Sequence, residues 1–191
     1  MNKILCSTGA FTGRSNGYNY RLLEPLSKTL ACDGFELMVD DEWYPEIEEV
    51  KRYIKNLNLY IPVVHCAKDI GELREIYPDI HYVFDTKMAA FHEQMDLLYD
   101  AAHDWLWKED HLRHYHVNDY GGGYMDWANL RTLPIGKGHV DFDRFFAVIK
   151  KTGYQGDFTV EATAHDEKGV VDADLLNEQF MKIREYLREK Q

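Results

Sequence analysis

The sequence predicts an α/β fold in which about six β-strands alternate with α-helices along a single domain, residues 1–191. Short apolar runs with strand-like composition alternate with longer segments whose apolar residues recur at helical spacing. In addition, 45% of the residues are hydrophobic and 29% are charged, which is typical of folded domains. Strands that alternate with helices of this length favour parallel pairing with right-handed crossover connections.

The first third of the chain supplies three of these strands and two of the helices. Each expected strand is a short apolar run, and the third is most densely apolar around Val63. Each expected helix has aliphatic residues that recur every three or four positions, so one face is apolar. Pro25 falls in the first turn of the first helix, where a proline is tolerated. The strands are expected at 3–8, 34–39 and 59–65, and the helices at 20–30 and 45–57.

The rest of the chain continues the alternation with three further strands. In the helix expected at 141–152, Phe142, Phe145 and Phe146 form an aromatic face. The longest irregular stretch, 118–137, contains three consecutive glycines, and loops of this length are usually functional or mobile. Strands are expected at 81–85, 112–117 and 157–161, and helices at 72–77, 89–106, 141–152 and 173–189.

Composition and charge limit the classes of function. No apolar run approaches the roughly 18 residues of a membrane-spanning helix, and the short apolar N-terminal stretch predicts a buried strand rather than a signal peptide. The three cysteines, Cys6, Cys32 and Cys66, form no C-x-x-C pair, so we expect reduced thiols and a cytoplasmic location. The formal net charge of −11 disfavours a nucleic-acid partner because an acidic surface repels phosphates.

Polar side chains stand at or just after the ends of the expected strands: Glu36, His65, Asp85, His116 and Glu161. In a parallel sheet of βα units these ends converge on one face, where active sites form. Carboxylates and imidazoles together suit divalent metal ions such as Mn²⁺, Mg²⁺, Co²⁺ or Zn²⁺. Such an ion polarises a carbonyl and its neighbouring hydroxyl, and a nearby carboxylate can then move a proton at the adjacent carbon.

Each of these residues also has a structural interpretation. His114 and His116 share one side of their strand because side chains alternate, but a histidine there can simply hydrogen-bond to loop backbone. Asp85 can cap the helix that follows it, and Glu161 can form a salt bridge across the mouth of the sheet. For Glu36, a structural or substrate-facing role is favoured over metal ligation.

Three segments in the last part of the chain resemble one known family. They are 114–119 (HYHVND), 133–142 (LPIGKGHVDF) and 153–161 (GYQGDFTVE). Together they are similar to the C-terminal third of the xylose isomerase-like TIM-barrel family, which includes sugar and sugar-phosphate isomerases and epimerases. The endonuclease IV type of abasic-site nuclease also belongs to that family. The similarity extends upstream through 82–86 (YVFDT), 34–37 (GFEL) and 62–65 (PVVH).

The resemblance implies a barrel of βα units and a divalent-metal-dependent isomerase or epimerase acting on a sugar or sugar phosphate. Aldose–ketose isomerisation or ketose epimerisation would proceed through an enediolate. The metal ligands would be Asp85, His116 and Glu161, and Glu161 would also be the catalytic carboxylate. The substrate-binding residues would be His65, Arg131, Trp127 and Glu36.

The chain is short for this family. A complete TIM barrel needs about 250 residues, so 191 residues fit a barrel shortened to about six βα units, with an apparent internal deletion near 71–73. The missing part would hold a fifth-strand Glu that in relatives is both a metal ligand and the second acid/base carboxylate. The family's Gly-His after Asp-Thr is here Lys87-Met88, so a pocket imidazole is also absent.

Two alternative functions stay open at this point. The first is a catalytically impaired relative that binds a sugar or a partner protein, and whose exposed sheet edges would favour homo-oligomers. For activity to survive, another acid such as Glu72 or Asp69 would have to replace the fifth-strand Glu. The second is an endonuclease IV-like nuclease, which is disfavoured because the loop before 135–138 offers no Asp or His there and the net charge is strongly negative.

Overall fold

The computed structural model of the chain describes residues 2–65, 81–108 and 112–188. The apparent deletion near 71–73, the helix expected at 72–77, Cys66, and the acids Asp69 and Glu72 all lie outside these residues. Within the described parts, no helix is both long enough and apolar enough to cross a membrane.

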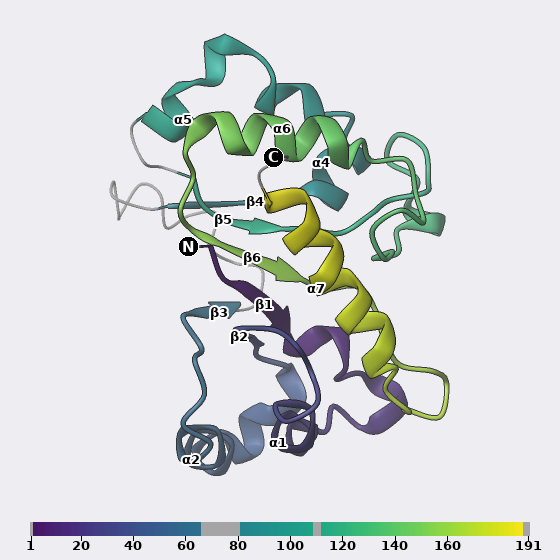
Figure 1. Cartoon of the computed structure of the whole chain (residues 1–191). Coiled ribbons are helices and arrows are strands. Elements are labelled where there is room, and N and C mark those ends of the chain that lie inside the picture. Colours follow the sequence, from purple (N-terminus) through teal and green to yellow (C-terminus); the bar gives the residue numbers. More distant parts are fainter. Residues whose placement is uncertain (1, 66–80, 109–111, 189–191) are drawn as a thin grey trace.

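Six strands form one parallel sheet, which confirms the predicted fold class (Figure 1). Their order is β3-β2-β1-β6-β5-β4, so β1 pairs with β6, while β3 and β4 lie at the two ends of the sheet and do not pair with each other. This is the cyclic order of a barrel that is open between β3 and β4 as far as the described residues go. The strands are β1 (Ile4–Ser7), β2 (Gly34–Met38), β3 (Val63–His65), β4 (Tyr82–Asp85), β5 (Leu112–His116) and β6 (Asp157–Val160).

The helices are arranged around the strands (Figure 1). Figure 1 places α1 and α2 beside the strands β1 to β3, and α4, α5 and α6 beside β4 to β6. The last helix, α7, packs against β1, β6 and α6. The helices are α1 (Leu23–Leu26), α2 (Ile47–Asn56), α4 (Thr86–Phe91), α5 (Trp105–Lys108), α6 (Phe142–Thr152) and α7 (Ala173–Leu187).

The main core fills the space between the sheet and the helices. Tyr115 of β5 stacks on Phe158 of β6 with ring centroids 5.6 Å apart, and Phe145 of α6 meets the edge of Tyr115. The aromatic face predicted for 141–152 is therefore buried, as its spacing indicated. Burial of each such large apolar side chain contributes about 1.5–3 kcal/mol, so this layer fixes the strands from which the polar residues project.

Alternation along each strand sends the neighbouring residues to the opposite face of the sheet. Cys6, Phe35, Tyr115 and Phe158 belong to the helix-facing core. Their immediate neighbours are therefore directed into the interior of the curved sheet. These interior residues are polar and buried: Ser7, Glu36, His114, His116 and Thr159.

Two expected helices differ from the structure. The single helix expected at 89–106 is wrong: α4 ends at Phe91, two 3₁₀ turns follow, and α5 begins at Trp105. Glu93 adopts a left-handed backbone (φ 52°), which no α-helix continues through. Asp100 then accepts a hydrogen bond from Ala102 N and starts a new turn. The helix expected at 20–30 is likewise shorter, because a 3₁₀ turn precedes α1.

The loop after β5 is fastened by a single buried carboxylate. Asp119 accepts hydrogen bonds from the backbone N–H groups of Tyr120, Gly136, Gly138 and Val140, at 2.8–3.0 Å. A short antiparallel bridge between Asp119 and Leu133 adds to this contact. The carboxylate therefore holds the 133–140 segment against the end of β5, beside the candidate site.

Candidate active site

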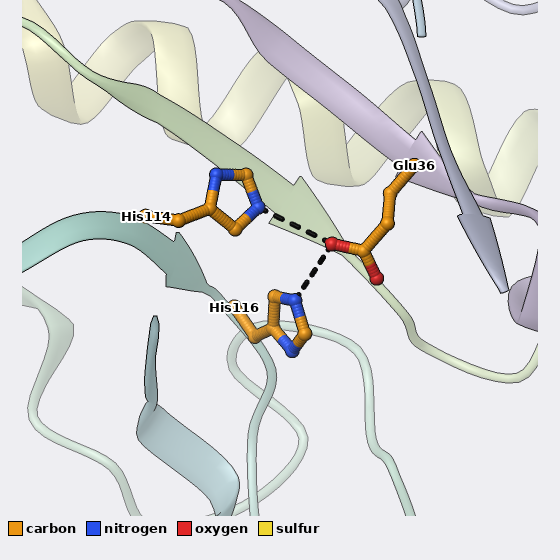
Figure 2. Close-up of side chains that lie close together, drawn as sticks. All are labelled: Glu36, His114 and His116. Atoms are coloured by element: carbon orange, nitrogen blue, oxygen red, sulfur yellow. Dashed lines mark hydrogen bonds and ion pairs between the residues drawn. The ribbon is translucent and has the colours of Figure 1, made fainter. Parts of the chain in front are cut away.

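Figure 2 shows Glu36 of β2 reaching across the interior of the sheet to two histidines of β5. One carboxylate oxygen, Glu36 Oε2, lies 2.8 Å from His116 Nε2 and 3.3 Å from His114 Nε2. His114 Nε2 also lies 2.8 Å from the hydroxyl of Thr159. Glu36 is completely buried, so its charge faces these two imidazole rings rather than bulk water.

His116 also contacts a second carboxylate through its other ring nitrogen. His116 Nδ1 lies 3.2 Å from Glu161 Oε2. The side-chain amide of Asn118 holds Glu161 at two points: Nδ2 donates to Glu161 Oε2 at 3.1 Å, and Oδ1 accepts from Glu161 N at 2.8 Å. The His116 ring is thus held between a buried carboxylate on one side and a carboxylate at the mouth of the sheet on the other.

Asp85 has the helix-capping role considered above, and it also faces the mouth of the sheet. Its Oδ1 accepts hydrogen bonds from Lys87 N at 2.9 Å and Met88 N at 3.3 Å, at the N-terminus of α4. Its other oxygen, Oδ2, lies 3.8 Å from the ammonium nitrogen of Lys87. That ammonium also donates to the hydroxyl of Thr132 at 3.1 Å.

Two groups of side chains in the described part of the chain could hold a metal ion, and they share His116. One consists of Asp85, His116 and Glu161, and the other of Glu36, His114 and His116; within each group the donor atoms lie within 4.8 Å of one another. The first group stands at the carboxyl ends of the adjacent strands β4, β5 and β6, and its carboxylate side chains are 18% and 13% exposed. Two carboxylates and one imidazole suit a divalent ion, and their partial exposure gives a substrate access. The donor set therefore fits a metal at the first group.

The charges of the site are strongly interdependent. Burial opposes a charge on His116, but the hydrogen bonds and negative charges of Glu161 and Glu36 outweigh it and raise its pKa to about 10. Burial likewise opposes ionisation of Glu161, but the hydrogen bond and charge of His116 hold its pKa below the usual value. For Asp85, burial prevails and raises the pKa, although Lys87 acts against it. At neutral pH and without a metal, His116 is therefore a cation between two carboxylates.

The other predicted site residues lie on the loop between β5 and α6 and at the end of β3. Arg131 is exposed on the loop between β5 and α6, next to Thr132. Trp127, on the same loop, is 66% exposed and packs edge-to-face against Phe91, with ring centroids 4.8 Å apart. His65 is the last residue of β3, and its side chain lies outside the described part of the structure.

Sequence reasoning missed four residues of the site. Asn118 belongs to the HYHVND segment, so its motif was noticed but its role as the holder of Glu161 was not. Lys87 was noted only as a departure from the family pattern, although its charge lies beside Asp85. Thr132 and Thr159 carry no sequence signal of their own, since only the three-dimensional arrangement brings their hydroxyls to Lys87 and His114.

A parallel sheet with helices on its outer side, and acids and imidazoles at its carboxyl ends, defines a barrel-type α/β protein. A sequence model described as xylose isomerase-like TIM barrel matches residues 69–189. The chain therefore belongs to the xylose isomerase-like TIM-barrel family. A search of curated proteins found no match.

Two similar solved structures come from Methylomonas sp. One is a D-allulose 3-epimerase in complex with D-allulose, with a TM-score of 0.59 at 12% identity, and the alignment covers 97% of each chain. The other is the same enzyme with additional C-terminal residues, with a TM-score of 0.60 at 13% identity, covering 97% of this chain and 98% of the other. At such low identity the likeness shows the fold alone. The mutual coverage means that a chain of nearly equal length adopts this shortened form of the barrel.

Proposed function

We propose that the protein is a divalent-metal-dependent isomerase or epimerase that acts on a sugar or sugar phosphate through an enediolate. The observation that carries this proposal is the convergence of Asp85, His116 and Glu161 at the ends of three adjacent strands, with donor atoms within 4.8 Å of one another. Membership of the xylose isomerase-like TIM-barrel family and the likeness of the fold to a D-allulose 3-epimerase support it. Mn²⁺, Co²⁺, Zn²⁺ and Mg²⁺ all accept such donors.

The three donors would hold the ion, which would polarise two adjacent oxygens of the sugar. Glu161 is the carboxylate best suited to carry a proton at the neighbouring carbon. It reaches the mouth of the sheet, its depressed pKa keeps it ionised, and Asn118 fixes one of its oxygens. Partial burial strengthens its interactions with a bound substrate.

The remaining sequence-predicted residues are proposed to bind the substrate rather than the metal. Arg131 would contact a substrate oxygen or phosphate, and Trp127 would supply an apolar wall at the rim. His65 would contribute from the end of β3. Glu36 is a different case, because it is completely buried beneath His116 and contacts ring nitrogens.

A sugar-binding relative without turnover is the second candidate function. It is favoured by one observation: Asp85 already serves as a helix cap and lies beside Lys87, so its availability to a metal is reduced. The second acid/base carboxylate expected from the resemblance is also absent from the matching segments of the sequence. Binding without turnover would leave the same fold and the same rim residues in use.

The deciding experiment combines metal content with proton exchange. The purified chain is loaded with Mn²⁺ or Co²⁺, its bound metal is quantified, and ketoses and ketose phosphates are incubated with it in D₂O. We expect about one ion per chain and incorporation of deuterium at the carbon next to the carbonyl. Both should be lost in Glu161→Gln and kept in Glu167→Gln, which changes an exposed loop acid. Metal and sugar binding without exchange would support the second candidate, and no bound metal would overturn the proposed metal dependence.

A further inference from the structure

We propose that Glu36 is a positioning residue that fixes the orientation and tautomer of His116, so that Nδ1 of this ring is presented to the divalent ion. The proposal rests on the metal site proposed above and adds a residue from β2, which contributes no ligand to it. It also gives Glu36 a role other than the substrate contact implied by the family resemblance.

The geometry around the ring separates its two nitrogens. Nε2 lies 2.8 Å from Glu36 Oε2 in the interior of the sheet, whereas Nδ1 lies 3.2 Å from Glu161 Oε2 at the mouth. Nδ1 is the ring nitrogen that contacts Glu161, which together with Asp85 supplies the two partly exposed carboxylates of the outer group. An ion held by these three residues therefore requires a lone pair on Nδ1 and a proton on Nε2.

Glu36 supplies the preference for that arrangement. A buried carboxylate facing Nε2 favours a proton there, because the alternative tautomer would set a lone pair against a negative charge in a site without solvent. Hydrogen bonding of the remote N–H to a carboxylate also raises the basicity of the donor nitrogen and holds the plane of the ring. Since Glu36 is 0% exposed, no water can easily take over this role.

Glu36 also contacts the other histidine of β5. His114 Nε2 lies 3.3 Å from the same carboxylate oxygen (Figure 2). The hydroxyl of Thr159 lies 2.8 Å from that nitrogen. His114 therefore contacts Glu36 without reaching the outer group of donors. This makes it a matched control: its replacement disturbs the same buried cluster while leaving the Glu36–His116 contact.

The alternative is that the metal ion lies in the interior of the sheet, bound by the inner group of side chains. If a metal were held by Glu36, His114 and His116 in the interior, Nε2 of His116 would be the donor and His114 would be essential. The outer position is favoured because it has two carboxylates and partial exposure, whereas the inner one has a single carboxylate and no exposed member. The two positions predict opposite results for His114 and for Asp85.

The test is Co²⁺ and Zn²⁺ titration of the full chain by calorimetry, with wild type, Glu36→Gln, Glu36→Leu, His114→Gln and Asp85→Asn. The melting temperature of each metal-free protein is measured alongside, so that loss of fold is separated from loss of affinity. We expect both Glu36 variants to bind about 10–100-fold more weakly, with Leu the weaker of the two. His114→Gln should stay within about threefold of wild type, and Asp85→Asn should lose affinity as a direct ligand.

The second readout is the ring itself. In the zinc-loaded wild-type protein, long-range ¹H–¹⁵N spectra should show His116 protonated at Nε2 and metal-bound at Nδ1. This measurement needs no variant, so it decides the proposal even if the Glu36 variants do not fold. Protonation at Nδ1 in the zinc form would overturn it.

The remaining outcomes are distinct from one another. Wild-type affinity in both folded Glu36 variants would overturn the positioning role and leave the metal site standing. Equal losses in Glu36→Gln and His114→Gln, with Asp85→Asn unaffected, would place the ion in the interior and overturn the proposal. A wild-type chain that binds neither ion would overturn the proposed metal site and the role of Glu36 together.

Discussion

The ammonium nitrogen of Lys87 lies 3.8 Å from Asp85 Oδ2, on a side chain that is only 16% exposed. A fixed positive charge therefore stands beside one of the carboxylates that we assign to a divalent cation. Thr132 holds the ammonium in this place through its hydroxyl. Lys87 and the metal ion would both be positive charges beside Asp85 in a partly buried site. Each therefore weakens the interaction of Asp85 with the other.

Lys87→Met is accordingly expected to tighten Co²⁺ or Mn²⁺ binding by about tenfold, or about 1.4 kcal/mol. Calorimetric titration at low salt measures the change. Lys150→Met, an exposed substitution on α6, serves as the control and should leave affinity within about twofold. Weaker binding in Lys87→Met would mean that the lysine supports the site instead of competing with the metal.

His116 makes metal binding dependent on pH. Its pKa of about 10 in the metal-free protein means that the ring is doubly protonated across the neutral range, and one proton must leave before Nδ1 can act as a donor. Metal affinity should therefore rise with pH, by about tenfold per unit between roughly pH 6 and 8. Calorimetry in buffers of different ionisation enthalpy should detect about one proton released per ion. An affinity independent of pH in that interval would argue against His116 as a ligand.

Asp119 should be the most costly carboxylate to remove outside the metal cluster. It is buried and accepts four backbone hydrogen bonds, which would all lose their acceptor in Asp119→Ala. We expect the free energy of unfolding in urea to fall by about 2–4 kcal/mol. Asp172→Ala, which removes an exposed N-cap of α7, should cost only about 1 kcal/mol. Equal losses in the two variants would show that the 133–140 loop is held by other contacts.

Trp127 is predicted to act on the substrate and not on stability. Its ring is mostly exposed and packs edge-to-face against Phe91. Trp127→Ala should leave the free energy of unfolding within about 1 kcal/mol, and it should weaken ketose affinity measured by calorimetry. Tyr124→Ala, at another exposed aromatic of the same loop, is the control. Unchanged sugar affinity in Trp127→Ala would count against its proposed role as a wall of the substrate site.

The strands were predictable because each is a short run of closely spaced apolar residues, without the three- or four-residue spacing that indicates a helix. Phe158, for example, belongs to a run that alternates between the helix-facing core and the polar interior. The break after α4 could not be seen in this way, because hydrophobic periodicity runs on through Glu93 while the backbone turns left-handed there. Tertiary packing and local capping, rather than helical pattern, decide where that segment bends.

The candidate site was only partly predictable for a similar reason. The convergence of strand ends in a parallel sheet pointed to polar residues at these positions, and the family resemblance singled out Asp85, His116 and Glu161 as ligands. The structure does bring these three together. The contact between Glu36 and His116 joins residues 80 positions apart in sequence. Which carboxylate meets which ring nitrogen depends on the twist and register of strands that are not neighbours, and a linear pattern does not contain that information.

The order of the strands has a consequence for the ancestry of such proteins. The three proposed metal donors all lie within residues 82–161, so one part of the sequence contains the whole set. Loss or gain of βα modules at the seam between β3 and β4 can change the size of the barrel without separating those donors. Glu36 alone comes from the other half, and it meets His116 because β6 pairs with β1. The three proposed metal donors can therefore be inherited together. The orientation of His116, by contrast, depends on how β2 is placed relative to β5.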